Sequence, residues 1–170
     1  MTDKIKKIIP VGIKAETEIW IFFSALAVGI CRALLFFQAY FREYNRLFNI
    51  EYGKRVLIKG RMMLDFYEIL EGTFNGFVIA IFGFICLIIF HYGYHYKDSK
   101  SIYTMKRLPN KYELHIRCFT FPVIGIITSI VISAILLVLF YLYYITKTPD
   151  ECLIPDQWER LFTAILNGGK

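Results

Sequence analysis

Three long apolar stretches alternate with charged segments along the chain, at about residues 19–41, 74–92 and 119–145. The third is the clearest, because 27 consecutive residues from Phe119 to Ile145 carry no formal charge. A helix rises about 1.5 Å per residue, so this one would be about 40 Å long and could cross a hydrocarbon core of about 30 Å. The pattern predicts an all-α, polytopic membrane protein with about three transmembrane helices.

Four shorter segments carry apolar residues on one helical face and charged residues elsewhere, which is typical of helices at a membrane surface. They cover about residues 1–18, 61–71, 98–118 and 156–166. The stripe between Arg61 and Leu70 and the one between Asp156 and Leu166 either lie on the bilayer or pack on the spans. We therefore expect a single membrane domain over residues 1–170.

Composition agrees with a lipid environment. Hydrophobic residues make up 56% of the chain, aromatic residues make up 18%, and the mean hydropathy is positive. The net charge of +6 fits contact with anionic lipid, and no separate soluble basic domain is present to bind nucleic acid. The four cysteines have no metal-site spacing, so we expect no metal and no cofactor.

The orientation follows from the two ends of the chain. The segment before the first span carries Lys4, Lys6, Lys7 and Lys14, whereas the tail after the third span is net acidic. Positive flanks favour the cytoplasmic side. We expect a multi-pass protein of the cell membrane with a cytoplasmic N-terminus and an external C-terminus.

Small residues recur at four-residue spacing in each span, which places them on one helical face where backbones can approach closely. We expect these residues to pack against other helices of the chain, another membrane subunit or a second copy of the chain. They are Ala25, Gly29 and Ala33, then Gly72, Gly76 and Ala80, then Gly125, Ser129 and Ser133.

Arg32 is the one formal charge inside a predicted span. A charge at that depth costs a few kcal/mol, so it should face protein or water. Two interpretations stay open. Arg32 lines a substrate path, or it reaches the interface or a neighbouring helix without a transport role.

The chain contains no nucleotide-binding or hydrolase motif, and we expect no enzyme activity. His91 and His95 are four residues apart and would share a helix face, which is the spacing of two metal or haem ligands. Their aromatic, basic surroundings favour an interfacial belt instead.

The connector between the second and third spans is a short amphipathic helix, then a turn at Leu108-Pro109-Asn110, then re-entry into the membrane. Such an element could be held by a soluble partner and could pass its movement to two membrane helices. The alternative is a basic loop that contacts lipid and only sets the topology.

The string from Met105 to Leu114 resembles the loop between the second and third spans of ABC-2-type transporter permeases, here in a chain of three spans. The basic lead-in before the first span also resembles the interfacial connecting helix of that family. The resemblance implies a coupling helix that docks on a separate ABC-type ATP-binding subunit. The residues that would contact this ATPase are Met105, Lys106, Arg107, Leu108, Pro109, Asn110, Lys111 and Glu113.

Three functions therefore stay open at this point. The first is a membrane subunit of an ABC-2-like transport complex, which couples ATP hydrolysis on another subunit to helix movement. The second is a small non-transporting anchor, assembly factor or regulatory subunit. The third is a membrane enzyme or electron carrier that uses His91 and His95.

Overall fold

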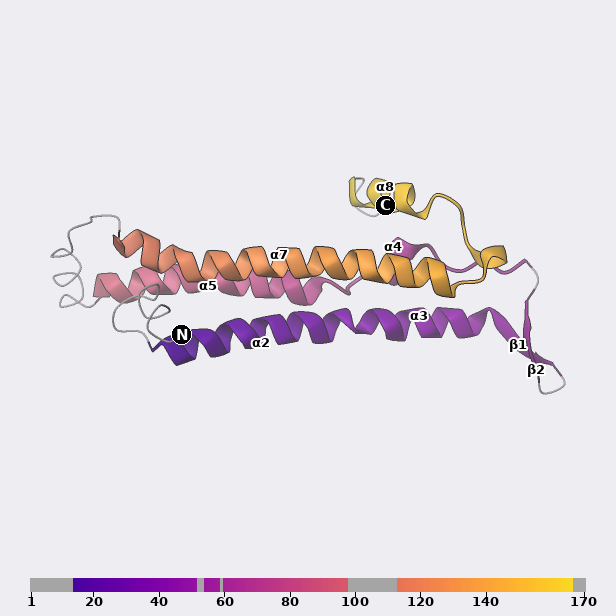
Figure 1. Ribbon diagram of the computed structural model, residues 1–170, viewed down its shortest axis with the longest axis horizontal. Helices are drawn as coiled ribbons and strands as arrows, with labels where there is room; N and C mark the ends of the chain where they lie inside the picture. Colours follow the sequence, from indigo (N-terminus) through magenta and orange to yellow (C-terminus); the bar gives the residue numbers. More distant parts are fainter. Residues whose placement is uncertain (1–13, 52–53, 59, 98–112, 167–170) are drawn as a thin grey trace. The chain divides into compact units, whose positions relative to one another are not determined.

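A computed structural model of the protein describes residues 14–51, 54–58, 60–97 and 113–166. Most of the described chain is helical, as the sequence predicts. In chain order the elements are α2 (Ala15–Ala33), α3 (Leu35–Arg46), β1 (Phe48–Glu51), β2 (Lys54–Leu57), α4 (Phe66–Ile69), α5 (Asn75–Lys97), α7 (Glu113–Lys147), the 3₁₀ helix η1 (Asp150–Cys152) and α8 (Gln157–Leu166) (Figure 1).

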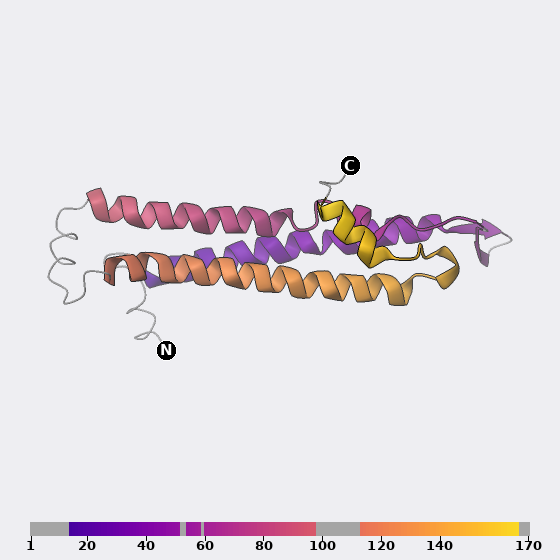
Figure 2. The ribbon, with the colours of Figure 1, turned by 90° about the horizontal axis from the view of Figure 1, so that it is seen from above.

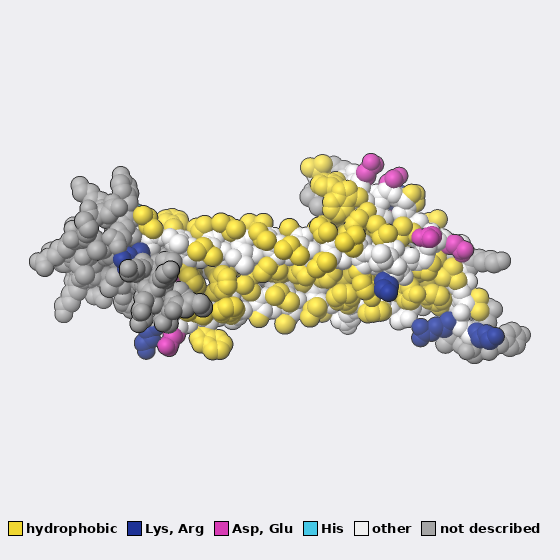
Figure 3. All heavy atoms as spheres, viewed as in Figure 1, with side chains coloured by type: hydrophobic (Ala, Val, Ile, Leu, Met, Phe, Trp, Pro, Cys, Tyr) yellow, Lys and Arg dark blue, Asp and Glu magenta, His cyan; other side chains and the backbone are white. Residues whose placement is uncertain are grey.

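Three helical stretches are long and apolar enough to cross a bilayer, which confirms the three predicted apolar helices. They are Glu16–Arg46, Asn75–Gly93 and His115–Lys147. The first stretch contains both α2 and α3, because Leu34 between them keeps helical backbone angles. Apolar side chains cover much of the visible face of these helices, as expected of surfaces that meet lipid (Figure 3).

The contacts divide the chain into two compact units. The first, called unit 1, contains the described residues up to Ile30 together with those of Asn75–Ser133. In unit 1, α5 runs antiparallel to α2, because the end of α2 at Gly29 lies beside the start of α5 at Phe77 (Figure 2). Buried residues of unit 1 include Leu26, Ala80 and Phe84.

Unit 2 contains the described residues of Cys31–Phe74 and Ala134–Lys170. Its core is aromatic. The rings of Phe36 in α3 and Phe140 in α7 are stacked with their centroids 4.3 Å apart, and Phe66 of α4 packs on both Phe36 and Tyr144. Large rings suit this place because each buries much apolar area and tolerates tilted and edge-on packing.

A β-hairpin follows α3 in unit 2, and the sequence analysis did not predict it. Strands β1 and β2 are antiparallel, and Phe48 pairs with Leu57 and Glu51 with Lys54. A fold class of helices alone is therefore too narrow for this chain. The hairpin turns the chain back, so that Ile58 N–H donates to the carbonyl of Leu47.

The helix predicted over Arg61–Leu70 is wrong in its length, because only Phe66–Ile69 is helical. The residues before it, 61–65, are in neither a helix nor a strand, and the N–H of Met63 donates to the carbonyl of Cys152 instead of joining a helix. Met63 and Phe66 are nevertheless buried, as the apolar stripe suggested. The predicted amphipathic segment 156–166 in the tail is helical over most of its length, as α8.

Candidate functional site

The most unusual group in the described chain is a buried acid beside a buried histidine. Glu18 lies in the first turn of α2, and His91 lies in the last two turns of α5. The side chain of Glu18 is 1% exposed and that of His91 is not exposed at all. Atoms His91 Nε2 and Glu18 Oε1 are 2.6 Å apart, which is an ion-pair distance.

The other nitrogen of His91 contacts the third helix of unit 1. His91 Nδ1 lies 3.3 Å from the backbone carbonyl oxygen of Cys118 in α7. This carbonyl would normally accept a helical hydrogen bond from residue 122, but that residue is Pro122, which has no N–H. His91 therefore supplies the donor that the proline removes, and the cluster joins α2, α5 and α7.

Glu18 and His91 lie at helix ends that favour their charged forms. A carboxylate in the first turn of a helix and an imidazolium near the end of another both complement the helix dipoles. Even so, the atom Glu18 Oε2 is buried without a hydrogen-bond partner among the described residues. Buried ionisable groups in a membrane helix are costly and point to function.

The interpretation of His91 as part of an interfacial belt is wrong, because its ring is fully buried against Glu18 and Cys118. Both of its ring nitrogens are engaged, so His91 as arranged offers no free nitrogen to a metal or haem. The side chain of His95 lies outside the described residues. Within the described chain, no group of three or more His, Cys, Asp or Glu residues could hold a metal ion.

A second contact lies near the same end of α5 and α7. The hydroxyl of Tyr92 and Nδ1 of His115 are hydrogen bonded, and the ring of Tyr92 also packs edge-on against Phe119. The end of α5 and the start of α7 are thus joined by two polar contacts on successive residues of α5.

Two of the predicted packing glycines seat aromatic rings. A Cβ atom on Gly29 would lie 2.8 Å from the ring of Phe77, and one on Gly125 would lie 2.6 Å from the ring of Phe84. Both rings come from α5. The small residues therefore make room for side chains of the neighbouring helix, and any side chain at Gly29 or Gly125 would displace a ring.

The remaining predicted packing residues are in varied places. Gly76, Ala80 and Ser129 are buried in unit 1, and Ala33 is buried in unit 2. Ala25 is partly exposed, and the hydroxyls of Ser129 and Ser133 donate to carbonyls of their own helix. Gly72 lies outside any helix in a turn with a φ of 74°, so its prediction as a helix-packing residue is wrong. Glycine suits that turn because it adopts positive φ without strain.

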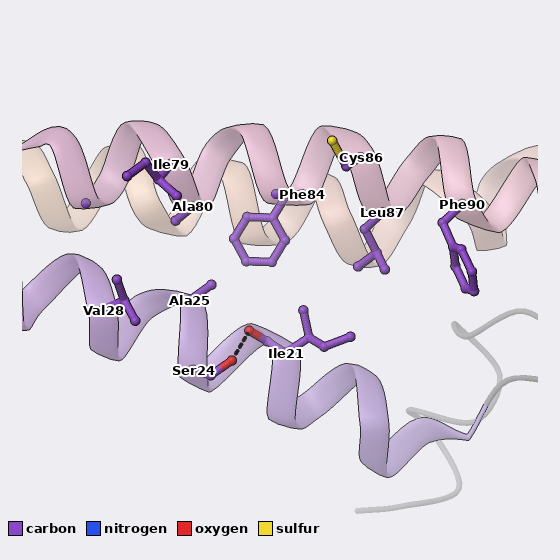
Figure 4. A pocket seen from close by; sticks show the side chains of 12 residues that line it. Ile21, Ser24, Ala25, Val28, Ile79, Ala80, Phe84, Cys86, Leu87 and Phe90 are labelled. Carbon is purple, nitrogen blue, oxygen red and sulfur yellow. Dashed lines mark hydrogen bonds between the residues drawn. The ribbon is translucent and has the colours of Figure 1, made fainter.

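An open groove of about 480 Å³ lies between α2 and α5 in unit 1 (Figure 4). Its lining includes Ala25, Gly76, Ala80 and Gly83, with Phe84 and Phe90 among the larger side chains. The one hydroxyl in the lining, on Ser24, donates to the carbonyl of Ile21 in its own helix. The groove can accept an apolar group but offers no charge to a polar ligand.

Unit 2 contains a network of satisfied polar groups between its aromatic core and α8. The buried side chain of Gln157 accepts a hydrogen bond from the N–H of Phe66 at 2.8 Å and donates to Asp65. Asp65 also pairs with Arg160 of α8 at 3.0 Å, and the hydroxyl of Tyr144 donates to the carbonyl of Leu64. These bonds hold α8 and the 61–70 segment together.

Arg32 lies in the last turn of α2 and is exposed, without a hydrogen bond or ion pair to any described residue. Its role in a substrate path stays a prediction. The predicted ATPase contacts from Met105 to Lys111 lie outside the described residues, as does the side chain of Glu113.

No protein-family model, curated protein or solved structure matches the chain. Its function has to be inferred from its own residues. The Glu18–His91 pair could not be recognised from the sequence, because the two residues are distant in sequence and Glu18 lies just outside the predicted first span. The signal that could have found part of it is Pro122, which marks the carbonyl four residues earlier as lacking a donor.

Proposed function

We propose that the chain is an integral membrane protein with three spans and a cytoplasmic N-terminus. We further propose that it is a membrane subunit of an ABC-2-like transport complex, powered by a separate ATP-binding subunit that docks on residues 105–113. The observation that carries the proposal is the Leu108-Pro109 loop sequence, which joins two apolar helices, α5 and α7.

The packing of unit 1 supports a coupling role for this loop. The helices on either side of the loop are tied to each other by the contacts Tyr92–His115 and His91–Cys118, and α2 is tied to them by Glu18. A push on the loop would therefore move three helices together. The transported substrate would pass along other surfaces, with Arg32 as a candidate contact.

The exposed apolar side chains support further membrane partners. Ile79, Phe82 and Ile89 of α5 and Ile127 and Ile130 of α7 are more than half exposed. In a bilayer these side chains would meet lipid, another membrane subunit or a second copy of the chain.

The first test is charge reversal in the loop. The double variant Lys106→Glu and Arg107→Glu should abolish co-purification with an ATPase, because the two cations are expected to meet acidic groups of that subunit. Insertion into membranes should be unchanged. Mass spectrometry of the complex isolated in mild detergent from the native host measures the result.

The chain offers a matched control for this experiment. Lys54 and Arg55 are a second adjacent pair of basic residues, and they are exposed in strand β2. The variant Lys54→Glu and Arg55→Glu should keep the ATPase. Retention of the ATPase by the loop variant, or accessibility of a Ser101→Cys variant to an impermeant maleimide on intact cells, would refute the coupling role.

A non-transporting anchor, assembly factor or regulator is the second candidate. It is favoured by the way rings and small residues fill the cores of both units, whose polar groups serve helix packing. If this candidate is right, the wild-type chain purifies without any ATPase, and the loop variant changes only its binding to anionic lipid.

A further inference from the structure

The proposed function leaves the buried cluster of Glu18, His91 and the Cys118 carbonyl without a role beyond packing. The cluster is dry, it contains two ionisable side chains, and it joins α2, α5 and α7. The positions of its protons follow from the hydrogen-bonding capacity of each atom.

The proton on Nδ1 of His91 is fixed by its partner. A carbonyl oxygen can only accept a hydrogen bond, so the contact with Cys118 requires a hydrogen on Nδ1. The carbonyl is free for this bond because Pro122 donates nothing to it. With Nδ1 protonated, a neutral ring has only a lone pair on Nε2.

This lone pair would face a carboxylate oxygen of Glu18 at 2.6 Å. Two acceptor atoms at that distance repel each other unless a proton lies between them. The proton can reside on Nε2, giving an imidazolium beside a carboxylate, or on Glu18, giving a neutral acid beside a neutral ring. Both arrangements hold one proton and leave the pair with no net charge.

Any other number of protons leaves a net charge in a site without water contact. In the described chain, the titratable group beside Glu18 and His91 is the thiol of Cys118 from α7, and the charged residue next to it in the chain is Arg117. A bare carboxylate or an isolated imidazolium would therefore be buried at a high cost, which the helices can avoid by separating.

We propose that Glu18 and His91 form a proton-binding site that holds α2 against α5 and α7 only while one proton is bound between them. When the helices separate and water reaches the two side chains, an ordinary imidazole is neutral above a pH of about 6.5 and an ordinary carboxylic acid is ionised. The separated state then holds no shared proton, whereas the closed state holds one.

The sign of the pH dependence follows from this difference. Above a pH of about 6.5 the separated state binds one proton fewer than the closed state, so the closed state is lost as the pH rises, by up to about tenfold per pH unit. The site thus takes up a proton when the helices close and releases one when they separate. A transport cycle that moved α2 would move this proton with it.

The variant Glu18→Gln provides the matched control. Its amide N–H can donate to the neutral Nε2, so the helices should stay closed without a proton and at any pH. The reporter is Cys118, which is fully buried. In chains with Cys31, Cys86 and Cys152 replaced by Ala, reconstituted in nanodiscs, labelling of Cys118 by a maleimide is measured against pH.

The ratio of labelling rates, wild type over Glu18→Gln, cancels the ordinary reactivity of the thiol. We expect this ratio to rise as the pH increases above 7, by up to about tenfold per unit. A ratio that stays constant with pH would overturn the proposal, because the proton would then not control the closed state.

A second measurement uses the wild-type chain and does not depend on a variant folding. Nitrogen NMR of ¹⁵N-histidine protein, with His91→Gln used to assign the signals, should show Nδ1 of His91 protonated in the closed state. An unprotonated Nδ1 would also overturn the proposal. Neither measurement involves an ATPase, so this proposal can fail or succeed independently of the coupling role of the loop.

Discussion

Single atoms decide how the helices of unit 1 approach one another. Gly29 and Gly125 leave the space that the rings of Phe77 and Phe84 fill, and Pro122 leaves the carbonyl that His91 uses. The two glycines lack a Cβ atom and Pro122 lacks an N–H hydrogen. In each case a side chain of α5 occupies the space or makes the contact that the missing atom would have prevented. Contacts of this kind specify one register between helices.

The variant Gly125→Ala should destabilise the chain by about 1–3 kcal/mol, because its new Cβ would lie 2.6 Å from the ring of Phe84. Gly83→Ala is the matched control in the same bundle, since a Cβ there meets nothing within 4 Å. Unfolding by a denaturing detergent, followed by circular dichroism, measures both. Equal midpoints for the two variants would show that the ring moves aside freely.

At the residue scale, the sequence indicated where helices pack but not which side chains pack there. The four-residue spacing drew attention to Gly29 and Gly125, which lie beside the rings of Phe77 and Phe84. It could not show that rings would fill the space, since the spacing of small residues does not say which large side chains of the neighbouring helix point toward them. It also placed Gly72 in a helix, although a glycine before a span is equally suited to a turn with positive φ.

Among the elements, α8 has one face that packs on unit 2 and another, apolar face that is exposed. Leu161 is buried, and Gln157 and Arg160 bond to the segment before α4. Trp158, Phe162 and Leu166 follow at four-residue spacing and are exposed. The ring of Trp158 lies 4.8 Å from that of Tyr141 in α7, so this stripe lies beside the last turns of an apolar helix.

We therefore expect the exposed stripe of α8 to lie in the interfacial region of the bilayer, where Trp is favoured. With Trp20 replaced by Phe, Trp158 is the one tryptophan left, and brominated lipids should quench its fluorescence.

The converse variant, Trp158→Phe, retains Trp20 in α2 and serves as the control for contact with lipid. Quenching of Trp158 by aqueous iodide but not by brominated lipid would place α8 away from the membrane.

The sequence predicted the long helices and α8 because their patterns are sustained over many residues. It did not predict the hairpin, because strands of four residues give too short an alternation to recognise. The helix expected over Arg61–Leu70 failed for a different reason. The non-helical residues before α4 gain hydrogen bonds to the tail, and no local pattern can reveal a partner such as Cys152.

The candidate site was harder still. The loop from Met105 to Lys111 could be read from the sequence alone, but the buried pair could not. Glu18 and His91 are brought together by the antiparallel packing of α2 and α5, which depends on contacts along the whole of unit 1. Long-range pairing of single charges leaves no periodic trace in a sequence.

On the scale of the whole molecule, the apolar helical stretches differ greatly in length. The stretch in α5 has 19 residues, about 28 Å, whereas that of α7 has 33 residues, about 50 Å. In the proposed membrane topology, one bilayer has to accommodate both. The longer helix can tilt or extend into the headgroups, whereas the apolar stretch of α5 is close to the thickness of a hydrocarbon core and the helix continues beyond it only to Lys97.

In this topology, the shorter α5 would set the bilayer thickness that suits the chain. Hydrophobic mismatch would exclude it from thick, sterol-rich bilayers, and lateral sorting would concentrate it where the hydrocarbon core is near 30 Å. Thermal stability in nanodiscs of phosphatidylcholines with increasing acyl length should be greatest near that value. An optimum in much thicker bilayers would mean that α7 sets the preference instead.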